Sequence, residues 1–386
     1  MCIRDSYNTM HFKPVDHTPD HEFGWWGETF GVWHKQGLPE EINDNGKGDF
    51  YFGFEMIAYC SGDYGFRPGF EHKVIEEDDR HVIYQDGAGV TMMENKSGES
   101  SIPKYLKFPV ETREDWENFK HRLDPNDPER KQKNIEQRVK DLNESDRAVG
   151  IGVGSLFGWI RNWMGFENLA MATIDDPEWV GEMVEYLGDL ILSQTEPFLA
   201  AGFKPQNAHF WEDIAFKNGP MVSPAFFDKY VIPHYKRITD RLLEAGCDVV
   251  SLDCDGNIMQ LAPLWIKGGV NTMFPIEIRG GTEPIKMREL YGRDVLLSGG
   301  MDKIALIEGK EATLAYLKKV EPYIREGGWI LHVDHRVPPD VTYDTYLYYL
   351  REKRAMLGIP EPAPYEDRLA ELWETNPERA AQFKEL

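Results

Sequence analysis

Short apolar runs alternate with longer amphipathic segments over most of the chain from residue 147 onward. The runs are rich in β-branched residues, as buried strands are, whereas the segments between them place apolar residues at helical spacing. The strands that we expect cover residues 148–153, 206–211, 249–252, 272–276, 295–297 and 329–333. Strands that are each followed by a helix predict a parallel sheet.

Start and stop signals mark the helices between these strands. Asp176 suits an N-cap, Pro177 the first helical position, and Gly202 the end of the same helix. We expect the other helices at residues 226–243 (with a kink at Pro233), 258–266, 284–291, 312–324 and 343–356.

The N-terminal third lacks the regular alternation of apolar runs and amphipathic segments. Residues 21–26 are the best candidate for a first strand of the same sheet. Residues 73–78, 81–85 and 90–94 lie between turn signals and predict an antiparallel excursion. Seven or eight strands in series, with no Gly-x-Gly-x-x-Gly turn after any of them, favour a (β/α)₈ TIM barrel over a dinucleotide-binding sheet.

The expected organisation is one α/β domain. The barrel covers residues 21–360, with a β-hairpin insertion at about 73–100. Residues 1–20 form an N-terminal segment, whose residues 1–6 are typical of a cloning or assembly scar, and residues 361–386 an acidic, peripheral tail.

Composition narrows the class of partner. The formal net charge is −23 over 386 residues, which disfavours nucleic acid and anionic membrane as partners. Four scattered cysteines do not make a disulfide framework. No apolar run approaches the roughly 18 residues of a membrane span, and the first residues lack the apolar core of a signal peptide. We therefore expect a cytoplasmic protein with a small-molecule substrate; a homodimer is one open oligomeric state.

Acidic and imidazole side chains follow the expected strands, at the end of a barrel where active sites lie. They are Glu212, Asp213, Asp253, Asp255, Asp302, His332, Asp334 and His335, and the amide Asn257 lies among them. We predict that Asp253, Asp255 and His335 hold a divalent metal, with Glu212 as fourth ligand or base; zinc, manganese or iron suits such ligands. The alternative is that these acids cap helices and face solvent.

Alternation along a strand refines this prediction. Asp253 and Asp255 are two apart and face the same way, so Cys254 between them is expected to be a buried core thiol. Glu212 and Asp213 face opposite ways, so only one of them can look into the barrel.

Further residues near the strand ends are candidate substrate contacts. Arg161 lies among aromatic residues and could grip a carboxylate, or simply pack on tryptophan at the surface. The other candidates are Asn257, Asp302, Asp334 and Trp25. Trp25 either walls the pocket or covers the barrel end.

Several motifs resemble the uroporphyrinogen decarboxylase superfamily over nearly the whole chain. They are Lys13–Pro19, Gly165–Leu169, Ser223-Pro224, Asp253–Asn257 and Gly299–Asp302. The resemblance implies a (β/α)₈ barrel. It also implies one of the superfamily's activities, which are decarboxylation and methyl transfer between corrinoid proteins and thiols such as coenzyme M.

Two departures from the superfamily pattern separate these activities. The Arg-Gln-Ala-Gly-Arg element of the decarboxylase is replaced by Trp25–Thr29, so a porphyrinogen with many carboxylates is disfavoured. Where the thiol methyltransferases bind zinc through His-x-Cys and a later Cys, this chain has Asp253, Asp255 and His335.

The expected function is metal-assisted methyl transfer, with zinc as first choice of metal. The corrinoid would arrive on a separate protein, because the chain has no Asp-x-His-x-x-Gly motif. The alternatives are a decarboxylase (a lyase), a non-catalytic barrel that partners a corrinoid protein, and, more remotely, a metal-dependent hydrolase.

Overall fold

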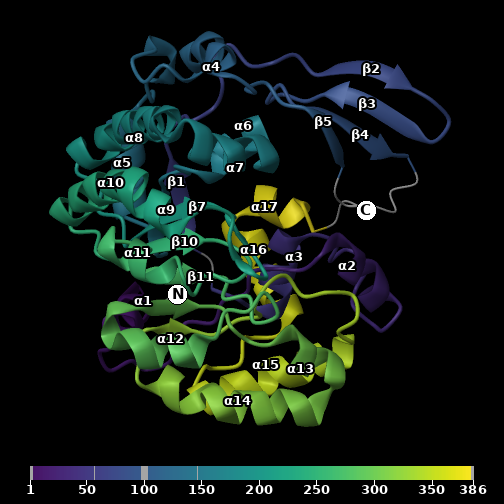
Figure 1. Cartoon of the computed structure of the whole chain (residues 1–386). Coiled ribbons are helices and arrows are strands. Elements are labelled where there is room, and N and C mark those ends of the chain that lie inside the picture. The colour runs from purple at the N-terminus through teal and green to yellow at the C-terminus, as the bar shows by residue number, and fades with distance from the viewer. Residues whose placement is uncertain (1–2, 56, 97–102, 146, 384–386) are drawn as a thin grey trace.

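The computed structural model describes residues 3–55, 57–96, 103–145 and 147–383. Its centre is a seven-stranded parallel sheet whose strands follow one another in chain order (Figure 1). The strands are β1 (Ala58–Ser61), β6 (Val149–Gly152), β7 (Asn207–Trp211), β10 (Val250–Asp253), β11 (Thr272–Phe274), β12 (Leu296–Ser298) and β13 (Trp329–Ile330). The six strands expected after residue 147 are all present, with ends shifted by a few residues.

Helices surround the strands, as expected for the barrel fold (Figure 1). The main ones are α8 (Pro177–Ala200), α10 (Ile232–Glu244), α11 (Ala262–Lys267), α12 (Pro284–Tyr291), α14 (Lys310–Arg325) and α15 (Tyr343–Leu357). The side chain of Asp176 accepts a hydrogen bond from the Trp179 amide at 3.2 Å, which confirms the expected N-cap of α8. The helix expected at 226–243 is instead two, α9 (Pro224–Tyr230) and α10, because Pro233 lies in the first turn of a new helix.

Residues 20–26 lie between the two edge strands of the sheet, β1 and β13, and are hydrogen-bonded to segments next to both. The Glu55 amide donates to the Asp20 carbonyl at 2.9 Å, and the Val337 amide donates to the Gly24 carbonyl at 2.9 Å. A single β-bridge joins Trp25 to Val337, so the expected first strand is an extended segment rather than a regular strand. Gly24 has a φ of +114°, which interrupts regular pairing there.

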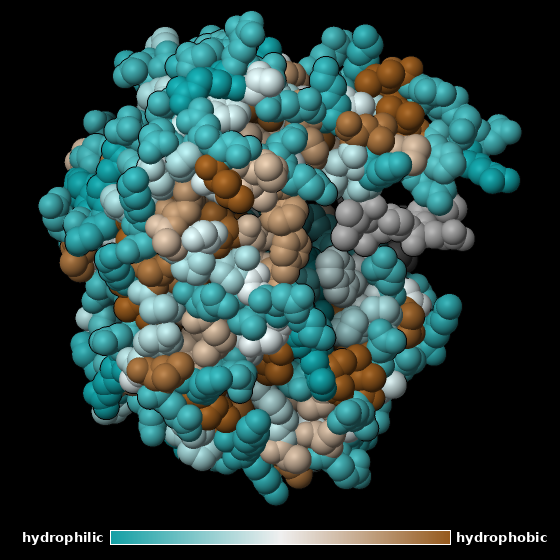
Figure 2. All heavy atoms as spheres, in the orientation of Figure 1, coloured by the Kyte–Doolittle hydropathy of each residue, from teal (hydrophilic) through white to brown (hydrophobic). Residues whose placement is uncertain are grey.

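A separate antiparallel sheet stands off the barrel as an arm (Figure 1). It consists of β2 (Lys73–Glu77), β3 (His81–Gln85), β4 (Thr91–Asn95) and β5 (Lys104–Lys107). The three expected strands are confirmed and β5 is an addition. Part of the expected insertion, residues 97–100, lies outside the described residues. The surface view shows apolar atoms on this arm, where Ile75 and Tyr105 are among the exposed side chains (Figure 2).

Shorter helices complete the chain. They are α1 (Ile3–Met10), α2 (Gly27–His34), α3 (Asn45–Phe52), α4 (Arg113–Phe119), α5 (Ile135–Asn143), α6 (Gly158–Met164), α7 (Phe166–Asp175), α13 (Lys303–Glu308), α16 (Tyr365–Thr375) and α17 (Pro377–Ala381). A two-stranded ribbon, β8 (Ala215–Phe216) and β9 (Gly219–Pro220), follows β7.

The ends of the chain pack against this framework. Tyr365 and Phe383 from the C-terminal tail contact Phe50 of α3, with ring centroids 6.0 and 4.8 Å apart. At the other end, residues 1–2 of the expected scar lie outside the described residues, whereas α1 is helical and buries Asp5. Within the described ranges, no helix is both long and apolar enough to cross a membrane.

Candidate active site

Three carboxylates meet where β7 and β10 end. Oxygens of Asp213, Asp253 and Asp255 all lie within 4.8 Å of one another. The strand register pairs Trp211 with Asp253, which brings the residues after β7 beside those after β10. The Asp255 amide donates to Asp213 Oδ1 at 3.0 Å and fixes that side chain. The expectation that Asp253 and Asp255 face the same way is confirmed.

His335 joins this acid cluster from the segment after β13. Its Nε2 lies 3.3 Å from Asp255 Oδ2. The imidazole stacks on Trp26, with ring centroids 5.4 Å apart, and meets the edge of Phe23 at 5.3 Å. These two aromatic rings hold the imidazole over the carboxylates.

The electrostatics of the cluster favour a bound cation. Burial, together with the charges of Asp213 and Asp255, raises the pKa of Asp253 to about 8, although Arg336 acts in the opposite direction. Burial and the neighbouring Asp255 also raise the pKa of Asp213. Close carboxylates resist ionisation unless a cation lies between them.

The donor atoms also fit a divalent metal. Within the part of the chain that the structure describes, the buried Oδ1 of Asp255 has no hydrogen-bond partner, so a lone pair remains for a ligand. Carboxylate oxygens and one imidazole nitrogen suit zinc, manganese or iron. Asp213, Asp253 and Asp255 are therefore the residues that could hold an ion, and His335, beside Asp255, is the nearest imidazole that could join them.

Glu212 is a correction to the predicted site. Its carboxylate is fully buried outside the acid cluster and accepts hydrogen bonds from three successive backbone amides. These are Leu156 at 2.8 Å, Phe157 at 2.9 Å and Gly158 at 2.6 Å, at the start of α6. Ser155 and Tyr235 hydroxyls donate to the same group. Because its hydrogen-bonding capacity is used at this helix end, Glu212 is not free to serve as fourth ligand or base. The acid after β7 that lies in the cluster is Asp213.

Arg161 and Asn257 lie near the cluster but are engaged in their own turns. Arg161 donates to the Asp213 carbonyl oxygen and to Asn162 Oδ1, and its guanidinium lies 5.4 Å from the Trp211 ring. Asn257 Oδ1 accepts from the Met259 amide at 3.2 Å. Arg161 thus supports the turn that carries Asp213, which is a positioning role and not the predicted grip on a substrate carboxylate.

Three other predicted substrate contacts are structural. Asp302 caps α13 by accepting from the Ile304 amide at 2.9 Å. Asp334 is fully buried and accepts from the amides of Ile278 and Lys303. Trp25 is 1% exposed and packs in the core against Phe52. Among the described lining residues of the cavity below the cluster, none of these three occurs. For Asp302 the helix-capping alternative holds.

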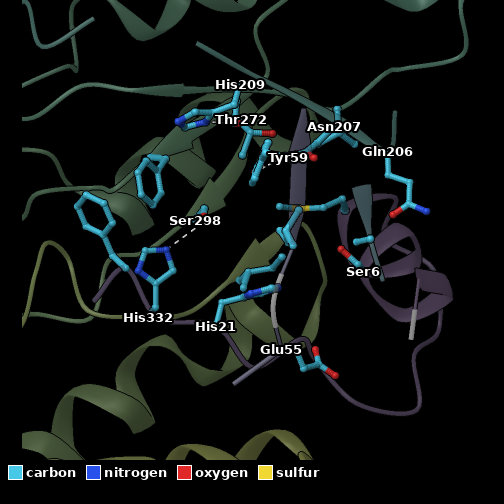
Figure 3. A pocket seen from close by; sticks show the side chains of 18 of the residues that line it. Ser6, His21, Glu55, Tyr59, Gln206, Asn207, His209, Thr272, Ser298 and His332 are labelled. Atoms are coloured by element: carbon cyan, nitrogen blue, oxygen red, sulfur yellow. Dashed lines mark hydrogen bonds between the residues drawn. The ribbon is translucent and has the colours of Figure 1, made fainter. Parts of the chain in front are cut away.

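A cavity of about 580 Å³ lies inside the ring of strands and reaches Asp253 (Figure 3). TIM-barrel interiors are usually filled by Val, Ile and Leu. Here several of the strand residues that line the interior are small or polar, namely Gly152, His209, Ser251, Thr272 and Ser298, beside the larger Tyr59, Phe274 and Ile330. The barrel interior keeps a cavity because the small side chains among these residues leave space that larger aliphatic side chains would fill.

Two uncharged imidazoles face this cavity (Figure 3). His209 Nδ1 lies 2.8 Å from Ser251 Oγ, and His332 Nε2 lies 3.0 Å from Ser298 Oγ. Burial lowers the pKa of His209 to about 4 and that of His332 to about 3. Both rings are therefore neutral near pH 7 and offer hydrogen bonds without charge.

Glu22 is a cavity residue that the sequence analysis missed. Its buried carboxyl group accepts from the Val333 amide and the Tyr346 hydroxyl, both at 3.1 Å. Burial raises its pKa to about 7. The sequence signal that could have found Glu22 is its position as an acid within residues 21–26, the segment expected to form the first strand. His209 carried a similar one, as a polar residue between the buried Ala208 and Phe210.

The fold and the acid cluster define a (β/α)₈-barrel protein whose site lies at the carboxyl ends of its strands. The profile of the family "Uroporphyrinogen decarboxylase (URO-D)" matches residues 85–352, which is more than half of the chain. The chain belongs to this family, as the motifs predicted.

Solved structures support the same fold. A methyltransferase from Methanosarcina mazei is 12% identical, with a TM-score of 0.54 over 91% of this chain and 96% of the other. A B12-independent methionine synthase from Shewanella sp. W3-18-1 is also 12% identical, with a TM-score of 0.37 over 75% and 74% of the chains. At these identities the first likeness shows the fold alone, and the second is too distant to support an argument. A search of curated proteins finds no match.

Proposed function

We propose that this member of the URO-D family is an enzyme that performs metal-assisted methyl transfer, with a separate corrinoid protein as partner. The observation that carries the proposal is the acid cluster of Asp213, Asp253 and Asp255, with His335 beside it, above a hollow barrel interior. The resemblance to the corrinoid-linked methyltransferases of the superfamily supports the reaction type. The spacing of Asp253, Asp255 and His335 follows theirs, with oxygen and nitrogen ligands and no sulfur.

A metal held by these four residues would supply Lewis acidity toward a donor or acceptor group. The chain's own residues do the rest. His209 and His332 orient a substrate in the cavity through neutral hydrogen bonds, and Phe23 and Phe274 add apolar wall to the same cavity. Glu22, with a pKa of about 7, can hold or release a proton near neutral pH.

Decarboxylation is the second candidate, and one observation favours it. Asp253 has a pKa of about 8, so in the metal-free protein its carboxyl group stays protonated at neutral pH and could donate to a developing carbanion. A polycarboxylate substrate is nevertheless disfavoured, because no lysine or arginine occurs among the described residues that line the cavity.

Metal analysis of the purified protein tests the proposal. We expect about one equivalent of a transition metal in the wild type, lost in Asp253→Ala and in His335→Ala. The matched control is Asp302→Ala, an acid at a neighbouring strand end that caps a helix, and it should keep the metal.

Failure to bind metal would contradict the mechanism. If the wild type holds none after reconstitution with zinc, manganese and iron, metal-assisted transfer is excluded, and decarboxylation or a non-catalytic role remains. If Asp302→Ala loses the metal as well, the acid cluster is not the site.

A further inference from the structure

The titratable groups that line the barrel cavity are acids and histidines, and burial favours the neutral form of both: it raises the pKa of Glu22 and Asp49 to about 7 and, with the charges of Asp213 and Asp255, that of Asp253 to about 8. Glu22, Asp49, Glu55 and Asp253 reach the cavity, whereas lysine and arginine are absent from its described lining. The three histidines that line the cavity add no positive charge to it near neutral pH. Burial lowers the pKa of His21, His209 and His332, so each favours its neutral form.

Aromatic rings form much of the cavity wall (Figure 3). The rings that line it are Tyr7, Phe23, Phe54, Tyr59 and Phe274. Phe23 and Phe274 meet edge to face with centroids 4.7 Å apart, and Phe274 lies 5.5 Å from the His332 ring. Phe and Tyr faces attract a cation within about 6 Å of the ring centre.

Glu22 is a buried acid, and the ring of His332 lies beside it, with Nδ1 3.9 Å from Oε1. The groups that donate hydrogen bonds to its carboxyl group are the Phe23 and Val333 amides and the Tyr346 hydroxyl, all uncharged. The neighbouring cation, Lys353, pairs with Asp20 at 2.6 Å and is not among the residues that line the cavity. A buried carboxylate is costly unless it is paired, and a positive ligand in the cavity would pair with it.

We infer that the cavity binds a small organic cation, an amine or quaternary ammonium group, as the substrate of this site. That the bound cation is a substrate rests on the proposed function, whereas its binding to the cavity requires neither metal nor corrinoid. The acids of the lining ionise most readily beside a positive ligand, and the rings of Tyr59 and Phe274 have no cation over them among the described residues. The rings of Tyr7, Phe23 and Phe54 already have Lys13, Arg336 and Lys353 at 4.5, 5.3 and 5.3 Å, and the neutral imidazoles add no opposing charge.

Calorimetric titration of the full-length protein with three ligands of matched shape tests this. The probes are choline, the uncharged 3,3-dimethylbutan-1-ol and the anion 3,3-dimethylbutanoate. We expect choline to bind at least about tenfold more tightly than the alcohol, and the anion to show no binding. The titrations are run on protein with and without added zinc.

Variants separate charge from shape. Glu22→Gln should weaken choline binding by about tenfold and leave the alcohol unchanged, because only the charge is removed. Glu308→Gln, an exposed acid on α13, is the control and should change neither. If Glu22→Gln does not fold, Phe274→Leu provides the second test and should weaken choline more than the alcohol.

Three results would overturn the inference: equal binding of choline and the alcohol, preference for the anion, or no binding of any probe by folded protein. They are distinct from failure of the proposed function. A protein that binds choline but no metal contradicts only the proposed metal-assisted methyl transfer. A protein that binds metal but not choline contradicts only the inference that the cavity binds an organic cation.

Discussion

Two adjacent acids, Glu212 and Asp213, follow the same strand and have opposite surroundings. The Glu212 carboxylate is surrounded by hydrogen-bond donors at the start of α6. Asp213 lies against two other carboxylates, with its pKa raised by burial and by Asp255. An acid whose donors are all supplied by the fold is structural, whereas acids that repel one another in the absence of a ligand mark a site.

The sharpest way to break this comparison is to remove Glu212. Glu212→Ala leaves three buried amides and the hydroxyls of Ser155 and Tyr235 without an acceptor, so we expect a loss of about 4 kcal/mol in the free energy of unfolding. Urea denaturation measures this. A loss below about 1 kcal/mol would show that Glu212 is not the structural acid described here.

A pH series tests the buried acid of the cavity. The pKa of Glu22 is about 7 in the folded protein against an ordinary 4.5, so the folded state binds more protons between these values. Its contribution to stability is present below about pH 4.5 and is lost as the pH rises through about 7.

From pH 5 to pH 8, the wild type should therefore lose about 2.5 kcal/mol relative to Glu22→Gln. Urea unfolding of both proteins at each pH gives the difference directly, and Glu308→Gln should follow the wild type. Parallel pH profiles for Glu22→Gln and the wild type would contradict the raised pKa.

Adding metal should stabilise the wild-type protein against unfolding but not a variant that lacks one carboxylate of the acid cluster. At a free metal concentration 100 times the dissociation constant, binding to the native state alone contributes about 2.7 kcal/mol. Thermal melts with and without zinc or manganese should therefore shift for the wild type and stay in place for Asp213→Asn. Equal shifts would place the ion elsewhere.

The smallest expected effect has the opposite sign. In metal-free protein at pH 8, Asp253→Asn removes a buried charge from among like charges, and we expect a gain of about 1 kcal/mol in the free energy of unfolding. Urea denaturation in the presence of a chelator measures it. A clear loss of stability would mean that Asp253 is held by favourable contacts, as Glu212 is.

The barrel could be predicted because its signals are local. Apolar runs and helix caps mark β6 to β13 and the helices between them, and each needs only neighbouring residues to be recognised. β1 was missed because Ala58–Ser61 is short and its pattern of exposure is not that of an apolar strand. The segment 20–26 was only half recognised, since its pairing depends on residues 55 and 337, far away in the chain.

The site was predicted in part for the same reason. Asp253 and Asp255 were found because alternation still holds at the end of β10. Alternation could not choose between Glu212 and Asp213, because the chain leaves strand geometry there and Asp213 has a φ of +54°. The hollow interior depends on small or polar residues from several strands together, which no single stretch of sequence reveals.

X-ray absorption spectroscopy of zinc-loaded protein tests the central claim, that carboxylates and His335 form a metal site, most directly. We predict a first shell of oxygen and nitrogen only, at about 2.0–2.2 Å, with the outer-shell signature of one imidazole. A sulfur ligand at about 2.3 Å, which would implicate Cys254, would contradict the account, as would an ion that carries only water.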